Sequence, residues 1–203
     1  MNKWTKLADK KTIDEIIEKL KPRNINAFYV ETASQAKEKV LELIPKGARV
    51  LVSSSQTLDK IRLSDEIDNS GEYFSVRKEY MGFDHLTQAD KIRISRSTPD
   101  YVVGSIHAIT KQGESIIASN TGSQLAAYAS GAGKVIWVVG AQKIVENLDE
   151  ALKRVYDYVL PLESERLKKV YGVTSNISKL LIYDKEVDPK RLTIIFVNEK
   201  LGF

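Results

Sequence analysis

Apolar runs suited to buried strands alternate along this chain with segments of helical periodicity. The runs richest in β-branched residues are "ARVLVSS" (48–54), "YVVGSIHAIT" (101–110), "ESIIAS" (114–119) and "KVIWVVG" (134–140). Strands that alternate with helices favour a parallel sheet covered on both faces. The turn "KQG" joins two of these runs into a hairpin, so the sheet is expected to be mixed. The pattern predicts an α/β fold with a mostly parallel mixed sheet and helices on both faces.

The other segments complete this alternation. Strands are expected at 26–30, 73–77, 179–184 and 191–198, and helices at 10–21, 31–44, 56–67, 123–130, 148–160 and 162–172. Residues 87–98 are compatible with a helix, although β-branched residues weaken that expectation. Thr32 and Gln35 have the spacing of a capping box, and Asn147 is placed to cap the helix at 148–160. We expect one domain over 1–203, with 1–45 packed on it as a helix–strand–helix segment.

The composition excludes several classes of site and location. The chain has 203 residues and no Cys, so disulfides, Cys-ligated zinc, iron–sulfur clusters and Cys nucleophiles are excluded within it. The charged start and short apolar runs resemble neither a signal peptide nor a membrane span, so a cytoplasmic protein is expected. The net charge of +4 is scattered along the chain rather than concentrated, which argues against nucleic acid as a partner.

Two hydroxyl-rich turns follow predicted strands and precede predicted helices. Parallel sheets bind ligands at the carboxyl ends of their strands, and the free N–H groups of a helix start attract anions. A glycine in such a turn lets a ligand approach the backbone. These turns are therefore predicted to hold a phosphate or carboxylate, although ordinary helix caps have the same composition. The candidate ligand-binding residues are Ser53, Ser54, Ser55, Gln56, Thr57, Asn120, Thr121, Gly122, Ser123, Gln124 and His107.

Histidine and glycine motifs give weaker signals. His107 follows an apolar run, where it can donate to a ligand, transfer a proton or simply pack as a structural residue. His85 is expected in a loop, and neither histidine has carboxylates at the spacing of a metal site, so no metal is expected. "GAGK" (131–134) lacks the preceding glycine and following Ser or Thr of a phosphate-binding loop.

The stretch from Gly104 to Arg166, "GSIHAITKQGESIIASNTGSQLAAYASGAGKVIWVVGAQKIVENLDEALKRVYDYVLPLESER", and the end "VNEKLGF" resemble the lactate-utilisation (LUD) domain family. The resemblance implies a fold like ribose-5-phosphate isomerase, glucosamine-6-phosphate deaminase and the CoA transferases. Those proteins bind phosphorylated or CoA-linked ligands at strand-to-helix loops. Some family members accompany iron–sulfur subunits in L-lactate oxidation, but a chain without Cys cannot carry such a cluster.

One position departs from the family pattern, because Lys111 stands where many relatives have an acidic residue. The glutamate nucleophile and the acid cluster of the related enzymes have no match here, so no catalytic residue or cofactor is assigned. The resemblance implies binding of a small carboxylate, phosphate or CoA-linked metabolite in lactate or related organic-acid utilisation. The alternatives are an accessory subunit that needs a partner protein, and a sugar-phosphate or CoA-type enzyme. Self-association into a homo-oligomer stays open.

Overall fold

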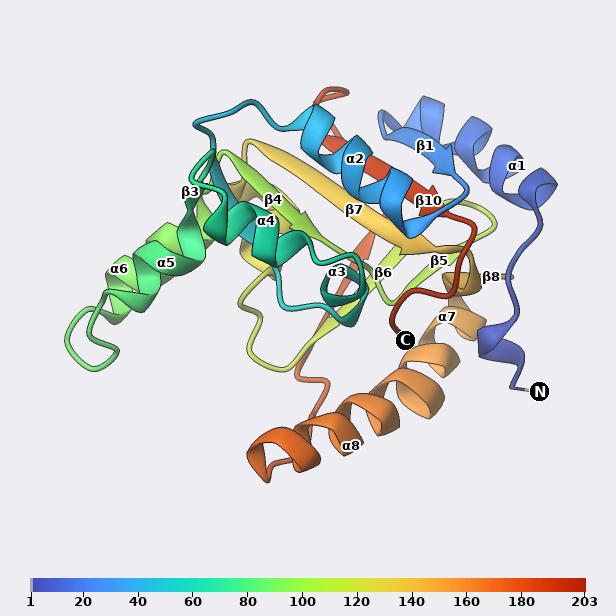
Figure 1. Cartoon of the computed structure of the whole chain (residues 1–203). Helices are drawn as coiled ribbons and strands as arrows, with labels where there is room; N and C mark the ends of the chain where they lie inside the picture. The colour runs from blue at the N-terminus through green and yellow to red at the C-terminus, as the bar shows by residue number, and fades with distance from the viewer. Residues whose placement is uncertain (1) are drawn as a thin grey trace.

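A computed structural model describes residues 2–203, and the chain forms two sheets with helices packed around them (Figure 1). The first sheet contains β1 (Asn26–Val30), β2 (Arg49–Val52), β3 (Phe74–Ser75), β4 (Tyr101–Gly104), β7 (Lys134–Gly140) and β10 (Leu192–Val197). The second contains β5 (Ala108–Thr110), β6 (Ser115–Ser119), β8 (Ile144–Val145) and β9 (Lys179–Tyr183). The α-helices are α1 (Lys10–Leu20), α2 (Ala33–Leu43), α3 (Gln56–Lys60), α4 (Leu63–Asn69), α5 (Val76–Met81), α6 (Ala89–Ser97), α7 (Leu148–Arg154) and α8 (Leu160–Tyr171).

All pairs in the first sheet are parallel, in the order β1-β10-β7-β4-β2-β3. Its central strand β7 is buried on both faces, which explains why its sequence is a continuous apolar run. Val135, Trp137 and Val139 point to one face, and Ile136 and Val138 to the other. Because every strand is parallel, the carboxyl ends of β2, β4 and β7 lie at the same edge of the sheet.

The second sheet is mixed, in the order β8-β5-β6-β9. After β4 and β7 end in the first sheet, the chain continues into the second sheet. Residues 105–107 connect β4 to β5, and the 3₁₀ turn η4 (Ala141–Lys143) connects β7 to β8. These two crossings bring polar segments to the same end of the first sheet.

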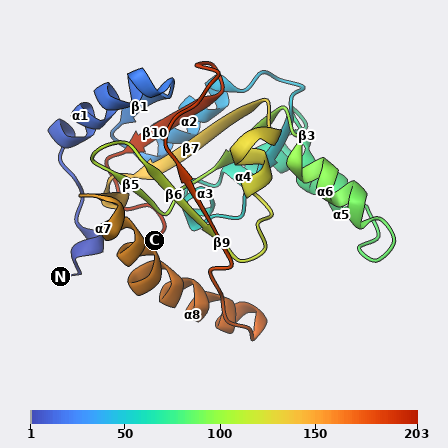
Figure 2. The same ribbon diagram turned by 180° about the vertical axis from the view of Figure 1, so that it is seen from behind.

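The elements form layers that are clearest when the two opposite views are compared (Figure 2). Helices α2, α3 and α4 pack on one face of the first sheet. Helix α1 packs on the other face, where it shares a core with the second sheet. Helix α7 covers the outer face of the second sheet. The predicted α/β class, with a parallel sheet and helices on both faces, is confirmed.

Several expected elements differ in detail, beginning with the strand at 101–110. It divides into β4 and β5 because the Ser105 hydroxyl donates to Val138 O at 2.7 Å and ends the ladder there. Residues 114–119 do not join the other runs in one mixed sheet, as expected, but form β6 of the second sheet. The expected strand at 73–77 is only β3, because Ser75 caps α5 through Lys78 N.

Three helical segments also differ from expectation. The helix at 56–67 divides into α3 and α4, because Arg62 takes a left-handed conformation with φ of 52°. The helix at 123–130 shortens to a π-helical turn, η3 (Ala127–Gly131). The two helices at 148–172 merge, because a π-helical turn, η5 (Val155–Val159), carries α7 into α8. The capping box of Thr32 and Gln35 and the Asn147 cap are present as expected.

Within residues 2–203, no helix combines the length and apolar character needed to cross a membrane.

One pair of helices, α5 and α6, projects from the body as an arm (Figure 1).

Gly104 ends β4 where the buried ring of Tyr128 passes closest to the sheet. A Cβ at this position would overlap the phenol oxygen of Tyr128, which is itself only 1% exposed and has little room to move. Gly104→Ala should therefore lower the free energy of unfolding by about 1–3 kcal/mol, the usual cost of overpacking. Urea denaturation of Gly104→Ala, Tyr128→Ala and the double variant tests this. The double variant should lose less than the sum of the single losses, and strict additivity would contradict the proposed clash.

Candidate functional site

A cavity of about 560 Å³ lies at the carboxyl ends of β2 and β4, beside the end of β6. Its floor consists of the polar segments that follow these strands, together with Lys143 from η4. Its opposite wall comes from η5 and α8 and is partly apolar, with Val155, Val159, Leu160 and Leu167. The cavity thus has a polar floor and an apolar wall, and its volume is typical of sites for small organic ligands.

The structure brings the two hydroxyl-rich turns and His107 together around this cavity. All the sequence-predicted residues except Gly122 line it: Ser53, Ser54, Ser55, Gln56, Thr57, His107, Asn120, Thr121, Ser123 and Gln124. The juxtaposition follows from parallel pairing of β2 with β4 and from the crossing of the chain into the second sheet. Their part in ligand binding stays a prediction.

Gly122 has a structural role in its turn, and its expected part in ligand binding stays a prediction. Its φ of 79° lies in the left-handed region, and a Cβ there would meet the aliphatic chain of Lys179. The glycine therefore shapes the turn and admits Lys179.

Part of the polar turn after β6 is occupied by its own hydrogen bonds. The Ser119 and Ser123 hydroxyls both donate to Gln124 Oε1, at 3.1 and 3.3 Å. Gly122 N donates to Ser119 Oγ at 2.9 Å. In the other turn, Ser55 is the N-cap of α3 and accepts from Thr57 N. Some of the hydroxyl groups therefore stabilise the turns, as ordinary caps do, while the turns as a whole face the cavity.

Lys143 is the principal residue that the sequence analysis missed. Its side chain is 2% exposed, and its Nζ donates to Thr57 Oγ1 at 2.9 Å, Ser105 Oγ at 2.9 Å and Ile106 O at 3.0 Å. These partners follow β2 and β4, so one amine joins the ends of three neighbouring strands. Burial, with a smaller contribution from the charge of Arg154, lowers the pKa of Lys143 well below its usual 10.5. The signal in the sequence was its position directly after a buried strand.

Arg154 is a buried cation close to the floor. It is fully buried in α7 and donates through Nη1 to the backbone carbonyl of His107. Its Nε and Nη2 atoms have no hydrogen-bond partner among the described residues. Burial lowers the pKa of Arg154 to about 10, so the guanidinium is still charged at neutral pH.

His107 is neutral and its tautomer is set by the backbone. Burial, followed by the charges of Lys143 and Arg154, lowers the pKa of His107 to about 3. Its Nδ1 accepts a hydrogen bond from Ala118 N at 3.1 Å, so the ring proton is on Nε2. His107 is therefore a neutral hydrogen-bond donor at the cavity wall rather than a base at neutral pH.

Tyr128 completes the floor and is held by an arginine. Its hydroxyl donates to Ser53 Oγ at 3.0 Å, and burial raises the pKa of Tyr128 to about 12. Arg191 holds the π-helical turn that carries Tyr128, donating to the carbonyls of Ala127 at 2.9 Å and Tyr128 at 3.0 Å. This arginine is paired with Glu186 at 2.7 Å, so its charge is compensated.

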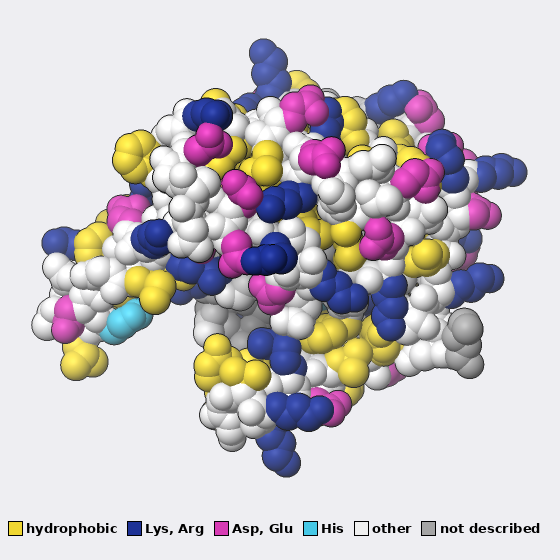
Figure 3. Space-filling model, viewed as in Figure 1, with side chains coloured by type: hydrophobic (Ala, Val, Ile, Leu, Met, Phe, Trp, Pro, Cys, Tyr) yellow, Lys and Arg dark blue, Asp and Glu magenta, His cyan; other side chains and the backbone are white. Residues whose placement is uncertain are grey.

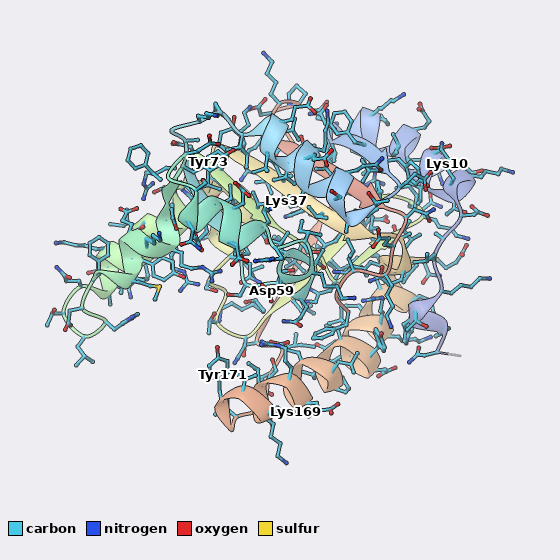
Figure 4. All side chains as sticks on the ribbon, viewed as in Figure 1. Lys10, Lys37, Asp59, Tyr73, Lys169 and Tyr171 are labelled. Atoms are coloured by element: carbon cyan, nitrogen blue, oxygen red, sulfur yellow. The ribbon has the colours of Figure 1, made fainter. Side chains whose placement is uncertain are left out.

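Charged side chains surround the opening between α3 and α8. Figure 4 shows Asp59 on α3 and Tyr171 on α8 at its two sides, and Figure 3 shows this face hollowed between the arm and α8. Desolvation raises the pKa of Asp59, although Arg77 and Arg166 oppose the shift. Arg166 is paired with Glu163 at 2.6 Å, whereas Arg77 lies 3.7 Å from Asp68.

In residues 2–203, no cluster of three or more His, Cys, Asp or Glu residues could hold a metal ion.

Lys111 lies in the β5–β6 turn, pairs with Glu146 at 2.6 Å and does not line the cavity. The charge of Lys111 is thus part of a surface ion pair.

His107 should make stability depend on pH in the acid range. Above about pH 6.5 the ring is neutral in both states, and below it the unfolded chain binds a proton that the folded protein does not accept until about pH 3. The free energy of unfolding should therefore fall by up to ~1.4 kcal/mol per pH unit through this group as the pH decreases. Urea denaturation from pH 7 to pH 4 should show a shallower decline for His107→Asn, which keeps an acceptor near Ala118 N. His85→Asn, in an exposed loop, is the matched control, and equal slopes in all three proteins would contradict the assignment.

Comparison with known proteins agrees with this architecture. A solved structure described as a duf162 family protein from Deinococcus radiodurans is similar to this chain, with a TM-score of 0.60 at 14% sequence identity. The match covers 95% of this chain and 100% of the other, and at such low identity it shows a shared fold alone. No protein with a curated description matches. Residues 13–197 match the family described as the LUD domain, so the chain belongs to the LUD domain family, as its sequence motifs imply.

Proposed function

We propose that the cavity binds a small anionic metabolite, a carboxylate, phosphate or CoA-linked compound, in lactate or related organic-acid utilisation. The observation that carries the proposal is the meeting of two hydroxyl-rich turns with the buried amine of Lys143 in one cavity. Family membership supports the metabolic context.

Charge favours an anion over a neutral or cationic ligand. The partners of Lys143 Nζ are neutral oxygen atoms, with no carboxylate among them, and the nearby Arg154 is a buried cation. At the opening, the charges of Arg166 and Arg77 are partly offset by acidic neighbours. The floor therefore retains a positive potential in a region screened from water, where Coulomb interactions are strongest.

The shape of the cavity favours an anion attached to a larger body. A volume of about 560 Å³ exceeds what lactate alone fills, and the apolar residues of η5 and α8 face the polar floor. This supports the alternative of a sugar-phosphate or CoA-linked substrate. An accessory subunit acting with a partner protein is the remaining alternative.

Isothermal titration with phosphate, lactate and CoA tests the proposal. Lys143→Met should weaken the binding of whichever anion binds by at least about tenfold, equivalent to ~1.4 kcal/mol. The matched control is Lys134→Met, which makes the same substitution at the opposite end of β7. Lys111→Glu should leave affinity unchanged, because its ion pair lies outside the cavity.

Equal effects of the two methionine variants would contradict an anion site at the floor. Ser54→Ala is a milder probe, because Ser54 is exposed within the cavity lining and its loss should not disturb the core. Turnover by the purified protein separates an enzyme from an accessory subunit. If binding appears only after a partner protein is added, the accessory role is favoured.

A further inference from the structure

We propose that Lys143 is a nucleophile that forms an imine with an aldehyde or ketone carbonyl of the anionic ligand. This inference rests on the proposed function, and it narrows the ligand class to oxo acids and phosphorylated carbonyl compounds. The chemistry needs a lysine amine that is deprotonated, reachable from the ligand site and held in one place.

The geometry places the amine at the ligand site. Lys143 and its three hydrogen-bond partners, Thr57, Ser105 and Ile106, all line the same cavity. The hydroxyl-rich turns lie around it, so an anionic group bound there would bring an adjacent carbonyl carbon towards Nζ. Few rotamers are open to a side chain held by three contacts, so the entropic cost of positioning the nucleophile is already met.

The surroundings of Nζ favour its neutral form. No described carboxylate contributes to keeping it protonated, and the dominant effect is burial, reinforced by the charge of Arg154. A neutral amine has two N–H donors and one lone pair. Two of the three oxygen atoms can hold the donors while the lone pair is directed at a carbonyl carbon. Desolvation and a neighbouring cation are the two general means by which proteins activate a lysine.

The reaction balances without an added oxidant or reductant. The Nζ lone pair forms a bond to the carbonyl carbon while the C=O π electrons move to oxygen, and a proton passes from nitrogen to that oxygen. Loss of the hydroxyl with the second amine proton gives C=N and one water molecule. His107 is a positioning residue in this scheme, because its Nε2–H is available to the ligand oxygen while Nδ1 is held by Ala118 N.

Reductive trapping of the full chain tests the proposal. The protein is incubated at pH 7 with pyruvate or glyoxylate and cyanoborohydride, and the adduct is located by peptide mapping. Lys143 should be modified at least about tenfold faster than any surface lysine, because surface amines with pKa near 10.4 are almost wholly protonated at pH 7. Lactate, which has the carboxylate but no carbonyl, should give no adduct and should slow labelling by pyruvate.

Two lysine variants provide the controls. Lys143→Arg replaces the nucleophilic amine with a guanidinium and should lose the fast adduct, whereas Lys134→Arg should keep it. Adducts spread over surface lysines at equal rates in wild type and Lys143→Arg would overturn the proposal. Calorimetry separates the two claims: anion binding with an unmodified Lys143 overturns the imine alone, and absence of both overturns the proposed function as well. If Lys143→Arg fails to fold, the map of the wild-type protein still decides the outcome.

Discussion

The hydrogen bonds of Lys143 Nζ hold together the end of the first sheet on which the cavity depends. They join η4 to the segments after β2 and β4, and these segments form the cavity floor. Burying a lysine costs free energy, several kcal/mol before its partners are counted, and the three oxygen acceptors offset only part of that cost. A residue that weakens the fold yet sits at the floor of a cavity is typical of a position kept for function.

Much of the fold could be predicted because local patterns and tertiary structure agree. The continuous apolar run of β7 identified a strand buried on both faces, and the spacing of Thr32 and Gln35 identified a helix start. The division at Ser105 could not be predicted, because a single serine does not usually end a strand and this one does so by a hydrogen bond to β7. The merging of α7 into α8 could not be predicted either, because no local sequence pattern indicates the π-helical turn between them.

The residues of the candidate site could also be predicted only in part. The hydroxyl-rich turns were found because parallel strands place their carboxyl ends together, which is a rule about topology. Lys143 was not found, because a lysine after a strand is ordinarily exposed and its burial depends on Thr57, 86 positions away. The neutral state of His107 likewise depends on its burial, and to a smaller extent on Lys143 and Arg154, which come from other elements. Ionisation states of this kind follow from tertiary packing and from no local pattern.

The unequal anchoring of the long helix α7–η5–α8 bears on how a ligand reaches the cavity. Its first part is packed into a core, with Ala151 and Val155 fully buried, whereas α8 contains no buried residue. Segments with few buried contacts open at a small fraction of the global unfolding free energy. The cavity wall made by α8 can therefore fluctuate while both sheets keep their packing. Movement of this one helix would widen the cavity for a bulky ligand without a hinge between domains.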